Sequence, residues 1–323
     1  MSLQQIIDTA VNVEVNRSKL VAQTISRSGR ISTASRNWAN PFRFVVTPKP
    51  VWTAAEYRSV FEPLFDRDKY ETHGISLNAV NSSTGLATLG NSWMINYQGN
   101  AGSDNNITSY YATSATAGTR IILSYNNSTT TTAGLFLVKA GDYIRVTGAK
   151  YPYIATSDVI IPTAFSGRIG TIAAAGTTTT VPENNANINF TTTATRTTVT
   201  LTTGTTTGLS VGQLLTKTAG TGVFGGITYI ESIESSTLFV IVSTTDCTSG
   251  SLTFSGTGNT ATPTVAVPIH RGYLETVSTD TICRVGARAA SFGVIVTKLP
   301  QIRYLPGQLV ELTSDLELIE EIL

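Results

Sequence analysis

Residues 119–146 read TRIILSYNNSTTTTAGLFLVKAGDYIRV, and this stretch shows the pattern of short apolar runs and turns from which we predict the fold class. Three short apolar runs, at 119–124, 134–138 and 142–146, are separated by turn-forming Asn, Ser, Thr and Gly residues. Strands that recur every ~8–12 residues with turn signals between them are typical of a β-sandwich or barrel. Because the same pattern runs through residues 75–159, we expect a mainly β fold.

The composition supports this interpretation. Of the 323 residues, 54 are Thr and 41% are hydrophobic, whereas charged residues make up only 13%. This hydrophobic share is sufficient for a core, and a long helical protein would need many more Glu, Lys and Arg residues. Cys247 and Cys283 are far apart in sequence, which indicates two isolated thiols more than a disulfide. Asp8 and Glu14 interrupt the N-terminal segment and no long apolar run occurs, so we expect neither a secretion signal nor a membrane span.

Residues 172–262 are expected to form a separate, Thr-rich β module. Only two basic residues, Arg196 and Lys217, occur in it, and Thr- or Gly-rich tracts lie at both of its ends. The earlier strand pattern resumes near Val265. We therefore predict a small domain inserted into a discontinuous domain of residues 1–171 and 263–323. Such an insertion in a surface loop should be removable without unfolding the rest.

The N-terminal region predicts a long hairpin. Residues 17–40 have no helical period, and Ser28-Gly29 is a turn signal, so we expect two extended arms joined near that point. Residues 42–47, FRFVVT, then alternate as in a strand, which the prolines at 48 and 50 end.

One short helix is predicted after these prolines. Thr53 can cap a helix, and Glu56 three residues later completes a capping box. Tyr57, Val60, Phe61 and Leu64 follow at helical spacing.

The stretch between Glu14 and Pro50 is strongly basic. It contains seven Lys and Arg residues and no acid, whereas residues 311–321 are acidic. Three interpretations are open: a solvated hairpin, a surface that contacts DNA phosphates, or an arm that lies across a neighbouring subunit. We favour the third, because Arg forms paired hydrogen bonds with carboxylates and the acidic C-terminal segment offers that charge. The predicted contact residues are Arg17, Lys19, Arg27, Arg30, Arg36 and Arg43.

The histidines and glycines offer little catalytic chemistry. His73 and His270 are far apart in sequence, and we expect hydrogen-bonded structural roles, that of His270 at the strand that follows the module. Residues 208–212 match Gly-x-Ser-x-Gly, but a nucleophile elbow needs a strand before Ser210, a helix after it and a histidine. The residues after 212 soon become rich in Gly and Thr, and the module has no histidine. We interpret the match as chance.

Paired carboxylates are the remaining catalytic possibility, since a glycosidase needs two acids about 5–10 Å apart in a cleft. Asp66 and Asp68 alternate with basic residues, while Glu317, Glu320 and Glu321 lie in the acidic terminus. We interpret both groups as solvated. Because metal-binding and phosphate-loop patterns are also lacking, we expect no enzymatic activity, no cofactor and no metal.

Several runs resemble tail structural proteins of long-tailed bacteriophages, especially phages of cyanobacteria and marine bacteria. The runs that carry the resemblance are NRSKLVAQ (16–23), SRSGR (26–30), NPFRFVVTP (40–48), GDYI (141–144), YPYIATSDV (151–159) and VPIHRGYL (267–274). The resemblance covers roughly residues 10–165 and 264–323. The module between them looks like a small β repeat that is found on many phage virion proteins.

The resemblance implies a tail-tube-like fold: a β-sandwich or barrel with one short flanking helix and a long N-terminal hairpin. It implies a structural virion protein that forms a ring, expected to be hexameric, in the baseplate hub or tail tip. Its partners would be further copies of itself, other tail proteins and DNA that passes through the ring. The protein would be assembled in the host cytoplasm and become part of the virion tail. An alternative is a receptor-binding or capsid-decorating protein, with the Thr-rich module as its adhesive part.

Overall fold

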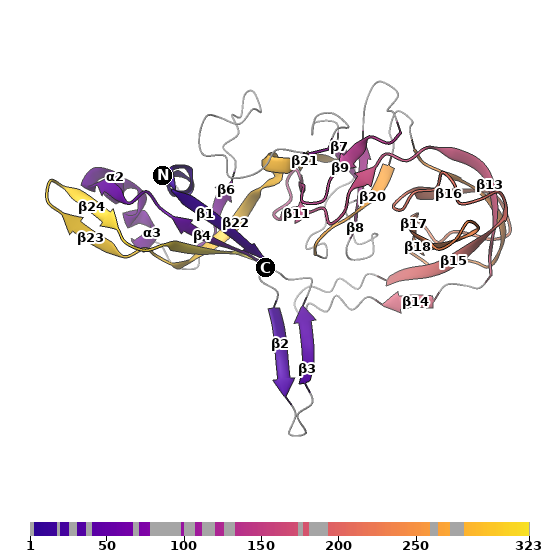
Figure 1. The fold of residues 1–323 in the computed structure, drawn as a ribbon, viewed down its shortest axis with the longest axis horizontal. Helices are drawn as coiled ribbons and strands as arrows, with labels where there is room; N and C mark the ends of the chain where they lie inside the picture. Colours follow the sequence, from indigo (N-terminus) through magenta and orange to yellow (C-terminus); the bar gives the residue numbers. More distant parts are fainter. Residues whose placement is uncertain are drawn as a thin grey trace. The chain divides into compact units, whose positions relative to one another are not determined.

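The computed structural model is mainly β. It describes residues 3–17, 20–25, 31–36, 41–66, 71–77, 98–99, 107–111, 120–125, 133–173, 177–180, 193–258, 264–271 and 281–322. The chain divides into two compact units (Figure 1). Unit 1 consists of Met1–Asn96, Lys150–Pro152 and Gly286–Leu323, and unit 2 consists of Tyr97–Ala149 and Tyr153–Val285.

The main sheet of unit 1 is antiparallel, with the strand order β1-β4-β25-β22-β6. These strands are β1 (Asn12–Arg17), β4 (Phe42–Thr47), β6 (His73–Ser76), β22 (Ser291–Lys298) and β25 (Leu316–Glu320). The predicted strand at 42–47 is confirmed, and its alternation buries Phe42, Phe44 and Val46 while Arg43 is exposed. The ring of Phe292 lies 5.1 Å from that of Phe42 and 4.9 Å from that of Phe44, so aromatic packing between β4 and β22 forms the core.

A three-stranded sheet and short helices complete the described part of unit 1. The sheet has the order β23-β24-β5, with β5 (Val51–Thr53), β23 (Ile302–Leu305) and β24 (Leu309–Leu312). The helices are α1 (Leu3–Thr9), α2 (Ala54–Val60), α3 (Glu62–Asp66) and the 3-10 helix η2 (Gly286–Ala289). No helix in the described part of the chain is long and apolar enough to span a membrane.

The predicted capping box is confirmed. The Thr53 hydroxyl accepts a hydrogen bond from the Glu56 backbone N–H, and the Glu56 carboxylate accepts one from the Thr53 backbone N–H. The predicted single helix is two helices, because the chain breaks at Phe61. The break has a local cause, since Pro63 has no backbone N–H to donate to the Ser59 carbonyl. The Phe61 ring at the break is fully buried, with its centroid 5.4 Å from that of Trp52 and 5.5 Å from that of Tyr57.

The predicted N-terminal hairpin is confirmed as a separate two-stranded sheet. Strands β2 (Leu20–Ile25) and β3 (Ile31–Arg36) pair from Leu20 with Arg36 to Ile25 with Ile31. This register centres the hairpin on residue 28, although residues 26–30 lie outside the described ranges. Neither strand pairs with another strand of the described chain (Figure 1).

Unit 2 contains a first barrel of six strands in the order β11-β10-β21-β7-β8-β20. The strands are β7 (Ile107–Tyr111), β8 (Arg120–Tyr125), β10 (Tyr143–Val146), β11 (Tyr153–Ile154), β20 (Thr264–Pro268) and β21 (Thr281–Val285), and a two-stranded sheet of β9 (Phe136–Val138) and β12 (Val159–Ile160) is also present. An antiparallel bridge between Ala155 and Ile269 joins the ends of β11 and β20 and closes the sheet. The strands predicted within 119–146 are confirmed, whereas the one expected at 92–97 lies outside the described residues.

A second barrel, here called the Thr-rich barrel, occupies residues 165–256. Its sheet has the order β13-β19-β16-β17-β18-β15-β14, and β13 also pairs with β15, so six strands close while β14 extends β15. The strands are β13 (Phe165–Ile172), β14 (Thr177–Thr180), β15 (Thr193–Thr203), β16 (Leu214–Gly220), β17 (Thr228–Ile233), β18 (Leu238–Ser243) and β19 (Gly250–Gly256). Phe239, Phe254 and Leu252 belong to its own buried core. The sheet therefore begins at Phe165, before the predicted boundary at residue 172.

The two barrels of unit 2 share an apolar contact. Ile122 and Ala266 of the first barrel belong to the same buried cluster as Leu214, Tyr229 and Val242 of the Thr-rich barrel. The backbone N–H of Ala266 donates to the carbonyl of Gly212 at 2.8 Å. Removing the Thr-rich barrel would expose Ile122 and Ala266 to water. Its independence from the rest of the chain stays a prediction.

Candidate assembly surface

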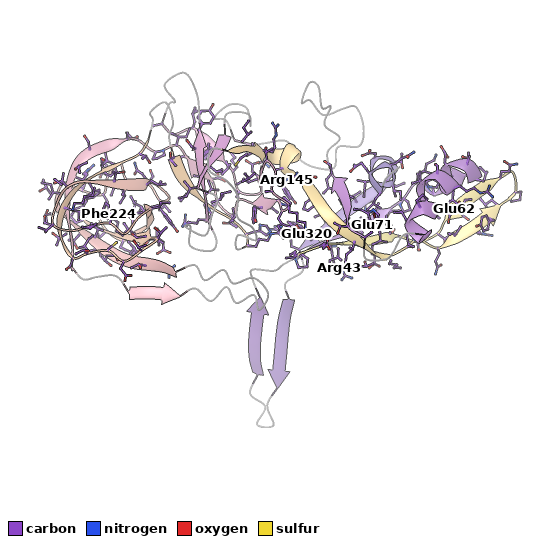
Figure 2. The ribbon with its side chains drawn as sticks, turned by 180° about the vertical axis from the view of Figure 1, so that it is seen from behind. Arg43, Glu62, Glu71, Arg145, Phe224 and Glu320 are labelled. Atoms are coloured by element: carbon purple, nitrogen blue, oxygen red, sulfur yellow. The ribbon has the colours of Figure 1, made fainter. Side chains whose placement is uncertain are left out.

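The outer face of the main sheet carries a mixed-charge cluster. Arg43 on β4 lies 3.6 Å from the Glu317 carboxylate on β25, and Lys298 on β22 lies 3.1 Å from the same carboxylate. The Arg43 and Lys298 side chains are about half exposed, so each ion pair stabilises the fold by no more than about 1 kcal/mol. One carboxylate therefore holds two of the basic side chains on this face. Arg43 is labelled in Figure 2.

The predicted contact residues fall into three groups. Arg17 is exposed on β1 and forms no ion pair within the described part of the chain, while Arg43 pairs with Glu317. Arg36 is the last residue of β3. Lys19, Arg27 and Arg30 lie outside the described residues, so their contact role stays a prediction.

The acidic C-terminal segment already has partners within its own chain. Besides Glu317, Asp315 accepts a hydrogen bond from the Thr47 hydroxyl at 2.8 Å, and the Glu321 carboxylate accepts one from Thr72. Glu311 lies 3.6 Å from Arg303. The segment thus offers a neighbour's arm less free negative charge than its sequence suggests.

Glu320 corrects the interpretation of the C-terminal acids as a solvated group. Its side chain points to the buried side of the sheet, where the residue is only 3% exposed, and its carboxylate accepts a hydrogen bond from the Phe42 backbone N–H at 3.2 Å. We expected Glu320 to be solvated because counting charges does not show which face of a strand a residue occupies. In β25, Leu316, Leu318 and Glu320 share the buried face.

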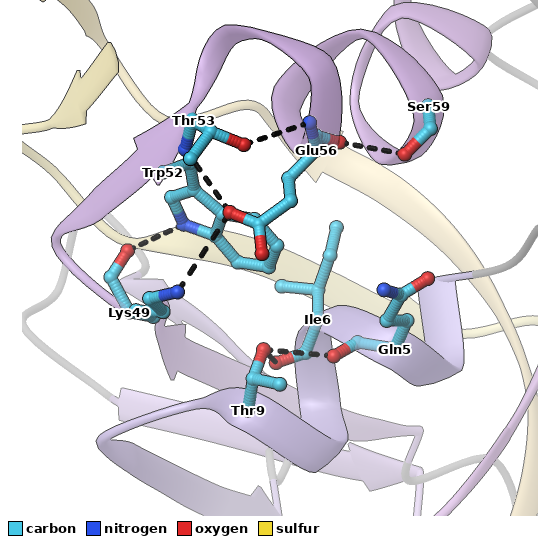
Figure 3. A network of polar contacts seen from close by, with 8 residues as sticks. All are labelled: Gln5, Ile6, Thr9, Lys49, Trp52, Thr53, Glu56 and Ser59. Carbon is cyan, nitrogen blue, oxygen red and sulfur yellow. Dashed lines mark hydrogen bonds and ion pairs between the residues drawn. The ribbon is translucent and has the colours of Figure 1, made fainter. Parts of the chain in front are cut away.

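Lys49, the last residue of the basic stretch, is also used locally. Its ammonium lies 3.8 Å from the Glu56 carboxylate and 5.3 Å from the centre of the Trp52 ring (Figure 3). The Trp52 indole N–H donates to the Lys49 carbonyl at 2.6 Å. Hydrogen bonds with Thr53, the backbone one first, and then the charge of Lys49 lower the pKa of Glu56. This network fixes the start of α2 and explains the position of Lys49 without a partner molecule.

The two edges of the main sheet differ. At the β6 edge, the side-chain amide of Gln4 on α1 accepts a hydrogen bond from the Ser76 backbone N–H at 2.6 Å and donates to the Ser76 carbonyl at 2.8 Å. Gln4 on helix α1 therefore occupies the outward-facing backbone groups of Ser76, as a further strand would. Sequence reasoning missed α1, although the spacing of Leu3, Ile6 and Ile7 is helical and all three are buried.

Among the described residues, no such cover lies at the β1 edge. Strand β1 pairs with β4 along all six of its residues and with no other described strand. Glu14 and Arg17 are exposed on it, and neither forms an ion pair within the described residues.

His270 has the structural role that the sequence predicts. Its Nδ1 atom accepts a hydrogen bond from the Ile154 backbone N–H, and its own backbone N–H donates to the Ile154 carbonyl, both at 3.0 Å. These bonds lie beside the bridge that closes the first barrel. The side chain therefore joins β11 to the segment that follows β20.

The Gly-x-Ser-x-Gly match at 208–212 lies in a turn that precedes β16, with no helix after it. The residue that follows, Gln213, is fully buried. Its amide donates to the carbonyls of Thr163 and Thr257 at 3.0 and 2.8 Å, and its oxygen accepts from the Ser210 backbone N–H at 3.2 Å. The motif thus positions a structural glutamine, and its geometry is not that of a nucleophile elbow.

The described residues include no group of three or more His, Cys, Asp or Glu side chains that could hold a metal ion. Comparison of the chain with protein-family models and with curated proteins finds no match. The proposal for function therefore depends on the sequence motifs and on the strands of unit 1 that have one edge without a partner strand in the described chain.

Proposed function

We propose that this chain is a non-enzymatic structural protein of a bacteriophage tail that assembles into a ring in the baseplate hub or tail tip. The motifs at 16–23, 26–30 and 40–48 support this function, as does the mainly β architecture with an N-terminal hairpin. In such a ring the hairpin would be the arm that contacts the next subunit.

One observation carries the proposal: β2 and β3 pair only with each other in the described chain. An isolated two-stranded hairpin is at best marginally stable in water, because it leaves backbone donors and acceptors unpaired on both edges. A neighbouring subunit can satisfy both edges. Closed cyclic symmetry also limits such pairing to a finite assembly, whereas open edges alone would allow unlimited growth.

The register of β1 with β4 allows a direct test. Arg17 and Phe42 are paired, so residues 18–41 can be replaced by Asn-Gly, which makes a two-residue turn between β1 and β4. We expect the wild-type chain to form rings in sedimentation velocity and electron microscopy. The shortened chain should remain a folded monomer with an unchanged melt of unit 1.

A wild-type chain that is monomeric at all concentrations, or a shortened chain that still forms rings, would contradict the proposal. The non-enzymatic part is tested separately with host surface polysaccharide. Depolymerisation that is lost when a single acid is changed to its amide would overturn it.

A further inference from the structure

We infer that the open β1 edge of one subunit receives strand β3 of a second copy, as an intermolecular extension of the main sheet. This inference rests on the proposed ring assembly and names the surface that makes it.

The asymmetry of the main sheet is the first argument. A ring with head-to-tail contacts needs two different surfaces on each subunit, one that offers a strand and one that receives it. The β6 edge is unsuited to receive one, because Gln4 already occupies the backbone N–H and carbonyl of Ser76. Of the two edges of the main sheet, β1 is the one left to receive a strand.

The second argument is the character of β1. An exposed edge of six residues is a ready template for another strand, and proteins normally shorten or cover such edges. Val13 and Val15 are half-buried, so a strand added beside them would extend the apolar face that Phe44 and Val46 already form. Backbone pairing along this edge would therefore be reinforced by side-chain burial.

The third argument is charge. Glu14 is exposed on β1 without an ion pair in the described part of the chain, whereas the segment from 15 to 55 contains no acid. Strand β3 ends at Arg36 and, among the described strands, pairs only with β2, so within the described residues one of its edges has no partner strand. Opposite charges at the contact favour this occupant over a second β1 strand, which would bring Glu14 near its own copy.

The test uses charge reversal on the full-length chain. The inferred pairing places residue 36 of one copy beside residue 14 of the next. Glu14→Arg and Arg36→Glu should therefore each raise the concentration at which rings form by about tenfold, since each brings two like charges together. The double variant, Glu14→Arg with Arg36→Glu, should assemble within about threefold of wild type, because each end carries the opposite charge again. Glu62→Arg is the matched control: this acid is 53% exposed on α3, away from β1, and its reversal should leave assembly unchanged.

A crosslinking experiment keeps the inference falsifiable if a reversed variant folds poorly. Chains carrying Glu14→Cys are mixed with chains carrying Arg36→Cys and oxidised; the native Cys247 and Cys283 are buried. We expect disulfide-linked dimers in this mixture and none when either variant is mixed with wild type.

The outcomes separate the two proposals. If the wild-type chain forms rings and the single variants assemble normally, the β1–β3 contact is overturned and the ring function stands. The same holds if the double variant loses assembly by the sum of the two single effects. A wild-type chain that never assembles overturns both.

Discussion

Gln213 offers the sharpest test of how unit 2 is held together. It is fully buried, and its side-chain amide bonds the segment before β13, at Thr163, to the segment after β19, at Thr257. These are the two points where the chain enters and leaves the Thr-rich barrel. Replacing Gln213 by Ala would remove the link between them.

The size of the effect follows from the three hydrogen bonds that Gln213 makes. Each contributes a net ~1 kcal/mol, and one lost buried methylene adds ~0.8 kcal/mol. The recovered rotamer freedom of the long side chain offsets about 1 kcal/mol of this loss. We therefore expect Gln213→Ala to lower the free energy of unfolding of unit 2 by about 3 kcal/mol. For a unit of this size the melting temperature should fall by about 6–12 °C.

Differential scanning calorimetry measures the fall in melting temperature, and hydrogen exchange shows which strands lose protection. Amide protection should fall first in β13 and β19, the strands that Thr163 and Thr257 adjoin. Gln213→Glu keeps the shape of the side chain but replaces the donating amide by an acceptor, so it should destabilise unit 2 at neutral pH at least as much as Ala. Gln301→Ala, at an exposed position of unit 1, should change the melting temperature very little.

Two results would refute this reasoning. If Gln213→Glu melted like wild type while Gln213→Ala did not, side-chain volume and not hydrogen bonding would be decisive. If both variants melted within about 2 °C of wild type, the link between entry and exit segments would contribute nothing to stability.

Further predictions concern both units. A Cβ atom at Gly212 would lie 2.6 Å from the Ala266 carbonyl oxygen, and Gly212 has φ +84°, so Gly212→Val should lower the melting temperature of unit 2 and leave that of unit 1 unchanged. Thr53→Ala should destabilise unit 1 by about 1 kcal/mol in urea titrations. Because the pKa of Glu56 is lowered in the fold, its contribution is present above its ordinary pKa and lost as pH falls through the folded value; Glu56→Gln should remove that acid dependence. Burial raises the pKa of Tyr57 to about 12, so the stability of unit 1 should fall as pH rises from about 10 toward 12, and Tyr57→Phe should weaken that fall.

Features set by local sequence could be predicted. The turn signal at Ser28-Gly29 gave the centre of the β2–β3 hairpin, and the alternation in FRFVVT gave the bounds of β4. The capping box at Thr53 and Glu56 needs only residues three apart, and it formed as expected. In each case the physical cause lies within a few residues of its effect, so one chain is sufficient to find it.

Features set by tertiary contacts could not be predicted. The Gln4 side chain is 72 residues from the backbone that it bonds, and Glu320 is 278 residues from the Phe42 N–H. Nothing in the sequence shows which strands become neighbours, and that choice decides which polar side chains are buried.

The same limit explains why counting charges gives an incomplete picture of the assembly surface. The sequence separates a basic start from an acidic end, which suggests two surfaces that meet between subunits. The sheet instead places β25 beside β4, so Glu317 already lies between Arg43 and Lys298 of its own chain. Much of the complementary charge is therefore paired within one chain. The charges most accessible to a second copy are those without an ion pair in the described residues, on strands that have a single neighbouring strand there. Glu14 and Arg17 meet that condition on β1, which makes strand edges the better guide to where a second copy would bind.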